Sequence, residues 1–103
     1  GSAWVSVGGV LDNIASNEAL RPSIDLRTDN NPVVSWQEWS GSNYHVWVKR
    51  WTGSTWSLVA NVADKNVSQN AKRPSLVLKS NNSPMISWDE WDGVSENVYV
   101  KQF

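Results

Sequence analysis

An all-β fold is predicted by three features of this sequence. Apolar and β-branched residues come in short runs separated by Asn, Asp, Gly, Ser and Pro, which is typical of strands joined by turns. No stretch has a convincing helical periodicity. The chain also repeats itself without a gap, because one shift places Trp4 on Trp56 and the Arg21–Ser23 segment on Arg73–Ser75. A repeat of about 50 residues indicates one structural unit that is built twice.

Four antiparallel strands are expected in each unit. The first is predicted at residues 23–27 and 75–79, the second from Pro32 or Pro84 to the glycine turns at 41 and 93, and the third at 44–51 and 97–103. The fourth is predicted at 56–62 and, in the other copy, at 4–10, so the chain begins with a fourth strand. Alternation of apolar residues in the third strand predicts that both sheet faces are buried.

Four strands per unit, two apolar faces and this period are together typical of a β-propeller blade. We therefore divide the chain into a first blade repeat, residues 1–51, which begins with the fourth strand, and a second, residues 52–103. A β-sandwich or a β-prism-like repeat remains the alternative. A sandwich explains the alternating strands but leaves the regular duplication unexplained.

Two blades leave two large apolar faces in water, and each unit is too small to enclose a core alone. We therefore expect a head-to-tail homo-oligomer in which the strand at Trp4 of one copy pairs with the Phe103 end of another. Three chains would give six blades and four chains would give eight. The trimer is favoured because six is a common blade number.

Several segments carry a family resemblance that covers the whole chain. Residues 31–36, 49–56 and 97–101 resemble repeats of bacterial β-propeller proteins. In architecture the chain also resembles the small two-blade bacterial lectins that trimerise into six-bladed, fucose-binding rings. The resemblance implies the fold and the assembly, and loosely a glycan ligand. Fucose specificity is not implied, because Asp25 and Trp36 fall where the Arg and Glu of the lectin site are expected.

The composition makes several partners weak hypotheses. Nine Lys and Arg against ten Asp and Glu leave a formal net charge of −1, which would not attract nucleic acid or an anionic membrane. No apolar run approaches the roughly 20 residues that span a bilayer. The absence of cysteine excludes thiolate metal sites and leaves the compartment open. We expect no cofactor and no metal.

The eight tryptophans are the unusual feature, and four residue positions that occur in both repeats form the candidate ligand site. Indole rings stack on the C–H faces of sugars, while carboxylate and guanidinium groups hydrogen-bond hydroxyls. The candidate residues are Arg21, Trp36, Glu38 and Trp39, with their counterparts Arg73, Trp88, Glu90 and Trp91.

A structural interpretation of the same residues stays open. Trp36 and Trp88 lie on the face expected to be core, and each arginine could form a salt bridge with the glutamate of its own repeat. Trp39 and Trp91 lie near turns and are the better ligand candidates.

Catalysis has little support from the sequence. His45 is the only histidine, has Asn97 as its counterpart and is expected to be an exposed strand residue. Three functions therefore compete: a multivalent carbohydrate-binding propeller, a structural or engineered module with no ligand of its own, and, least favoured, a glycoside hydrolase, so that no catalytic residue is assigned.

Overall fold

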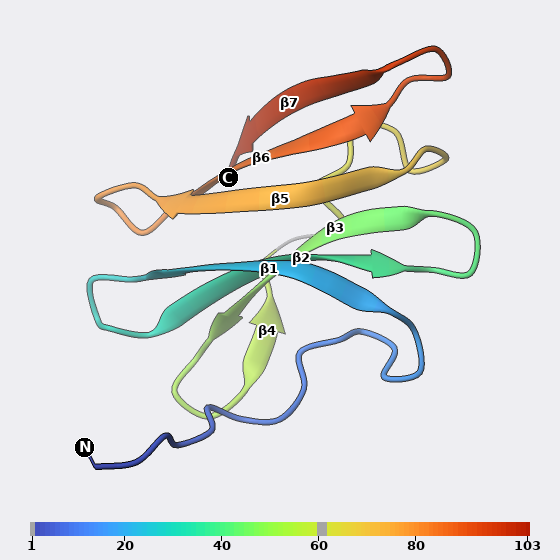
Figure 1. Ribbon diagram of the computed structural model, residues 1–103. Helices are drawn as coiled ribbons and strands as arrows, with labels where there is room; N and C mark the ends of the chain where they lie inside the picture. Colours follow the sequence, from blue (N-terminus) through green and yellow to red (C-terminus); the bar gives the residue numbers. More distant parts are fainter. Residues whose placement is uncertain (1, 60–61) are drawn as a thin grey trace.

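The computed structural model describes residues 2–59 and 62–103 as two antiparallel sheets, and no helix is present among these residues (Figure 1). The first sheet has the order β1-β2-β3-β4 and the second the order β5-β6-β7. The strands are β1 (Ala19–Leu26), β2 (Pro32–Trp39), β3 (Tyr44–Trp51), β4 (Trp56–Leu58), β5 (Ala71–Leu78), β6 (Pro84–Trp91) and β7 (Glu96–Gln102). The all-β prediction is confirmed.

The first strand of each unit begins earlier than the sequence suggests. The pairing of β1 with β2 shifts register between Leu20 and Ser23, and β5 has the same irregularity against β6. Arg21 and Arg73 lie in the irregularity with positive φ angles of 60° and 54°. Such a bulge accommodates the following proline, which has no N–H to donate. Because the bulge interrupts the alternation of apolar and polar residues, the sequence pattern does not indicate the part of the strand that precedes it.

The fourth strand differs from its prediction. β4 pairs with β3 as expected, with Trp56 opposite Trp51, but it ends at Leu58. Residues 60–61 of the predicted strand lie outside the described residues. Residues 4–10 form no strand within one chain, and the second sheet has the three strands that one chain is expected to supply to it. A strand requires a paired edge, and within this chain residues 4–10 do not lie beside β7.

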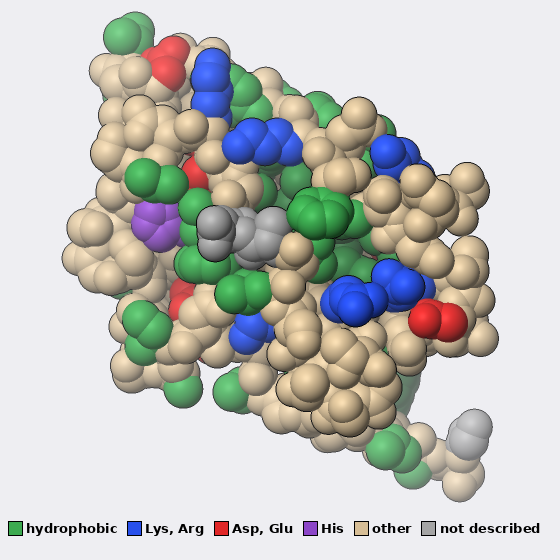
Figure 2. Space-filling view, turned by 180° about the vertical axis from the view of Figure 1, so that it is seen from behind, with side chains coloured by type: hydrophobic (Ala, Val, Ile, Leu, Met, Phe, Trp, Pro, Cys, Tyr) green, Lys and Arg blue, Asp and Glu red, His purple; other side chains and the backbone are tan. Residues whose placement is uncertain are grey.

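The two sheets pack face to face, with β1 and β5 adjacent (Figure 1). Val46 of the first sheet and Ala71, Ile86 and Trp88 of the second form one buried cluster between them. Figure 2 shows the molecule from behind, with hydrophobic side chains distributed among polar and charged ones over that face. We call the junction between the two sheets, around Val46, Ala71, Ile86 and Trp88, the internal seam.

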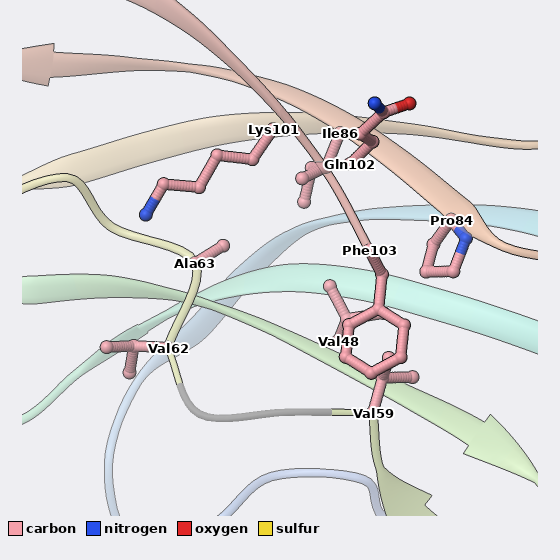
Figure 3. Close-up of a pocket in the computed structure, with 9 residues that line it drawn as sticks. All are labelled: Val48, Val59, Val62, Ala63, Pro84, Ile86, Lys101, Gln102 and Phe103. Carbon is pink, nitrogen blue, oxygen red and sulfur yellow. The ribbon is translucent and has the colours of Figure 1, made fainter.

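The internal seam is open at one edge, where a small hollow of about 150 Å³ lies between the sheets. Figure 3 shows Ile86 above this hollow and Val48 and Val59 below it, with the ring of Phe103 directed toward the two valines. The lining is mostly apolar, so the hollow extends the core and offers few groups that could orient a polar ligand.

Candidate functional site

Two of the candidate positions form one hydrogen-bonded unit that occurs twice. The indole N–H of Trp36 donates to Glu38 Oε1 at 2.9 Å, and that of Trp88 donates to Glu90 Oε1 at 2.8 Å. All four side chains are buried. Residues i and i+2 of a strand share a face, which explains how a Trp-x-Glu sequence produces this pair.

Each glutamate also holds the loop that enters its own sheet. Glu38 accepts the backbone N–H groups of Asn13 and Ile14, both at 3.0 Å. Glu90 accepts the equivalent groups of Lys65 and Asn66, at 3.0 and 2.8 Å. The carboxylates are therefore used in the fold, and the sequence offers no signal for this role beyond their occurrence in both repeats.

The indole faces of this unit are partly covered as well. Lys49 Nζ lies 5.8 Å from the centre of the Trp36 ring, and Lys101 Nζ lies 5.8 Å from that of Trp88. The same ammonium groups donate to the backbone carbonyls of Leu11 and Asp64. A sugar ring would have to displace this arrangement in order to stack on either indole.

The arginines do not pair with the glutamates, so the predicted salt bridges are wrong. Arg73 instead forms a bidentate pair with Asp89, at 2.9 and 2.6 Å. This pair raises the pKa of the Arg73 guanidinium. Asp89 replaces Gln37 of the first repeat, and both arginine side chains are exposed. Arg21 thus remains available at the surface without the acidic partner that Arg73 has.

The tryptophan that ends the second strand differs between the sheets. Trp39 is half-buried and packs edge-on against Tyr44, with ring centres 5.1 Å apart. Trp91 is 39% exposed, because Glu96 stands where Tyr44 stands in the first repeat. The second sheet therefore leaves one indole accessible at the end of β6.

A hollow of about 530 Å³ adjoins Trp91, between the loop that precedes β5 and the ends of β6 and β7. Lys65 Nζ lies 4.9 Å from the centre of the Tyr99 ring in its wall. Asp92 already accepts two backbone N–H groups of its own turn, which lower the pKa of its carboxyl group. The lining residues are Lys65, Asn66, Val67, Gln69, Glu90, Trp91, Asp92 and Tyr99. We call this hollow the Trp91 groove.

His45 is the residue that the sequence reasoning misplaced. It is not an exposed strand residue, since its side chain is 14% exposed and its Nδ1 lies 2.6 Å from Asp64 Oδ2. Asp64 Oδ1 also accepts the backbone N–H of Val46 at 2.8 Å, so Asp64 joins its loop to β3 of the other sheet. The pairing links positions far apart in the sequence, and no local motif indicates it.

Burial raises the pKa of Asp64 above its ordinary value of 3.8, against the lowering effect of the Val46 N–H and of His45. A raised pKa means that the folded state holds this proton more tightly than the unfolded state does. The contribution of Asp64 to stability is therefore fully present below pH 3.8 and is lost as the pH rises through the folded pKa.

The Asp64→Asn variant has no carboxyl group to ionise, so we expect it to lack the decrease in stability that Asp64 causes as the pH rises. The asparagine keeps an acceptor for the Val46 N–H. The difference in unfolding free energy, variant minus wild type, should increase from pH 4 toward neutrality. Urea denaturation followed by tryptophan fluorescence measures it. Asp29→Asn, at an exposed carboxyl whose pKa is lowered by the N–H of Asn31, should show a difference of the opposite sign. A pH-independent difference for Asp64→Asn would contradict this assignment.

The described ranges contain no group of three or more His, Cys, Asp or Glu side chains that could hold a metal ion. They also contain no helix long and apolar enough to cross a membrane. No protein-family model matches the chain, and neither a curated protein nor a solved structure matches it. The function must therefore be argued from the geometry.

Proposed function

We propose that the protein is a carbohydrate-binding, lectin-like β-propeller whose aromatic sites lie beside the seams between blades. The observation that carries this proposal is the Trp91 groove, in which an accessible indole lies beside a phenol, an ammonium group and side-chain amides. Of the eight candidate residues, Trp91 is the one whose ring is both exposed and next to a polar hollow. Glu90 supports the floor of the groove through its bonds to the loop.

The chemistry of the groove suits a sugar ring. An indole binds the C–H face of a pyranose by dispersion and apolar burial. The Lys65 ammonium and the Gln69 amide can hydrogen-bond hydroxyl groups at its edge. Among the described residues that line the groove, the carboxylates are Glu90 and Asp92, and both already accept backbone N–H groups. Binding without hydrolysis is therefore proposed.

Trp91→Ala is expected to weaken glycan binding about tenfold or more, since it removes the stacking surface. Trp91→Phe keeps a flat ring and should retain most of the affinity. A glycan array followed by calorimetry on the best neutral sugar measures both effects. Val94→Ala, at an exposed position of the neighbouring turn, is the control. Absence of binding to any glycan by the folded protein would contradict the proposal.

A structural module without a ligand is the second candidate, and one observation favours it. The repeated Trp36–Glu38 and Trp88–Glu90 units are buried and fully used in the fold. Four of the eight repeated candidate residues are thus explained by packing alone. Only a binding measurement on the Trp91 groove separates the two functions.

We further propose that copies of this chain complete a ring, because its two outer faces repeat the two halves of the internal seam. Val46 is fully buried in the seam, whereas its counterpart Val98 is 76% exposed on the outer face of the second sheet. Leu76 is 8% exposed on the other half of the seam, whereas its counterpart Ile24 is 64% exposed on the outer face of the first sheet. The outer face of the second sheet in one copy could therefore pack against the outer face of the first sheet in another, as the two sheets pack at the internal seam.

The polar contacts of the seam can be repeated in the same way. Ser23 Oγ accepts the backbone N–H of Leu76 at 3.2 Å. The counterparts of these residues are Ser75 and Ile24, so Ser75 could accept the backbone N–H of Ile24 in another copy. The side chain of Asn82 bonds the backbone and the hydroxyl of Thr28, and the equivalent residues are Asn30 and Ser80. A second copy is thus a partner whose chemistry the exposed faces already match.

The edge of β7 suits the same arrangement. Repeating the pairing of Trp51 with Trp56 would place Trp4 of a copy opposite Phe103. Trp4 and Val5 are almost wholly exposed, at 103% and 84%. A trimer with six blades is favoured over a tetramer with eight, and in either assembly several Trp91 grooves would act together.

A further inference from the structure

A second polar hollow, of about 450 Å³, lies at the internal seam on the side of the β3–β4 turn. Its lining includes the two arginines Arg27 and Arg50, the amides of the turn before β6, and the ring of Phe103. No residue of the Trp91 groove takes part. Basic side chains lie next to each other on the face shown in Figure 2, close to hydrophobic ones. We call this hollow the arginine hollow.

The basic groups of the arginine hollow are weakly engaged. Arg27 contacts Asp29 through one atom pair at 3.5 Å, and the Asp29 side chain is 51% exposed, so the interaction is weak. Arg50 has no ion pair within the described part of the chain and is exposed. Asn81 uses its carbonyl oxygen to accept the Ser83 N–H, which leaves its NH₂ group as a donor.

The second repeat shows which of these features are special to the first. Arg27 corresponds to Lys79 and Arg50 to Gln102, and Lys79 Nζ bonds Gln102 Oε1 at 3.0 Å. Within the described residues, two arginines therefore line the hollow at the internal seam, where the second repeat has a lysine and a glutamine. The position of Asn81 is taken by the acidic Asp29 in the first repeat. At a seam between copies, Lys79 and Gln102 would thus take the places of the two arginines, and Asp29 of a copy would take the place of Asn81.

We propose that the arginine hollow binds the carboxylate or sulfate group of an anionic saccharide, an inference that rests on the proposed carbohydrate-binding function. A guanidinium group donates two parallel hydrogen bonds to either anion, and two of them can hold it from both sides. The NH₂ group of Asn81 supplies a further donor.

Calorimetric titration with a sulfated disaccharide, a uronic acid disaccharide and an uncharged disaccharide tests the proposal. Arg50→Gln, which installs the residue of the other repeat, is expected to weaken binding of the anionic sugar about tenfold or more. Arg27→Lys keeps the charge but removes the fork, and should weaken it less. Lys79→Gln changes the net charge equally and should leave the affinity within about twofold.

The outcomes separate this inference from the proposed function. Tighter binding of the sulfated or of the uronic disaccharide identifies the anion, provided that Arg50→Gln weakens it and Trp91→Ala does not. Equal affinity for charged and uncharged sugars, or wild-type affinity in a folded Arg50→Gln protein, overturns the arginine hollow while leaving the Trp91 groove untouched. Loss of neutral-sugar binding alone leaves this inference standing. A thermal melt of each variant verifies folding.

Discussion

Replacing Glu90 by alanine is expected to lower the free energy of unfolding by about 3 kcal/mol or more. The carboxylate accepts three N–H groups, from Trp88, Lys65 and Asn66, in a place that is 2% exposed. Removal leaves these donors without a partner next to the buried core, and each charge-assisted hydrogen bond is worth about 1.5–3 kcal/mol. A cavity under the loop adds to the loss.

Urea denaturation followed by tryptophan fluorescence measures this effect. Glu96→Ala removes the same group at an exposed position of β7 and should change stability by about 0.5 kcal/mol or less. Glu38→Ala should resemble Glu90→Ala, because Glu38 has the equivalent three donors. If Glu90→Ala lost no more stability than Glu96→Ala, the glutamates would not hold the loops.

The second large effect is expected when aspartate replaces valine at either of two equivalent repeat positions, Val46 and Val98. Val46→Asp is expected to unfold the chain, because it places an unpaired carboxylate in a fully buried site of the internal seam. Val98→Asp is expected to leave the sheets folded, since Val98 is 76% exposed within one chain, but to prevent assembly by placing a charge in the seam between copies.

Circular dichroism and light scattering separate these results. The account predicts an unfolded Val46→Asp chain and a folded, single-chain Val98→Asp protein beside an oligomeric wild type. Val94→Asp, at an exposed turn position, should assemble as the wild type does. A Val98→Asp protein that assembled normally would place the contact between copies elsewhere.

The fold could be predicted from the sequence where a signal was local or repeated. Alternation and turn residues indicated β2 and β3 and their counterparts close to their observed bounds. The start of β1 was missed because the bulge at Arg21 interrupts the alternation. The strand predicted at residues 4–10 needs the edge of another copy, which one chain does not supply, so its prediction rests on the repeat and on the proposed assembly.

The candidate site illustrates the same limit. The repeat singled out Trp36 and Glu38, but a repeated residue can serve packing as well as binding, and their hydrogen bonds give them a structural role. Proximity to a turn favoured both Trp39 and Trp91; Trp91 is accessible, whereas Trp39 is half-buried against Tyr44. The pairing of His45 with Asp64 could not be predicted, because it joins β3 to the connection between β4 and β5 through a contact that depends on the tertiary packing.

The mass of the protein in solution, determined by light scattering across a range of concentrations, tests the central claim most directly. The claim is that the exposed faces bearing Val98 and Ile24 are covered by other copies of the chain. The account predicts a closed species of three chains, or of four, each of 11.5 kDa. A folded protein that keeps the mass of one chain at every concentration would contradict it.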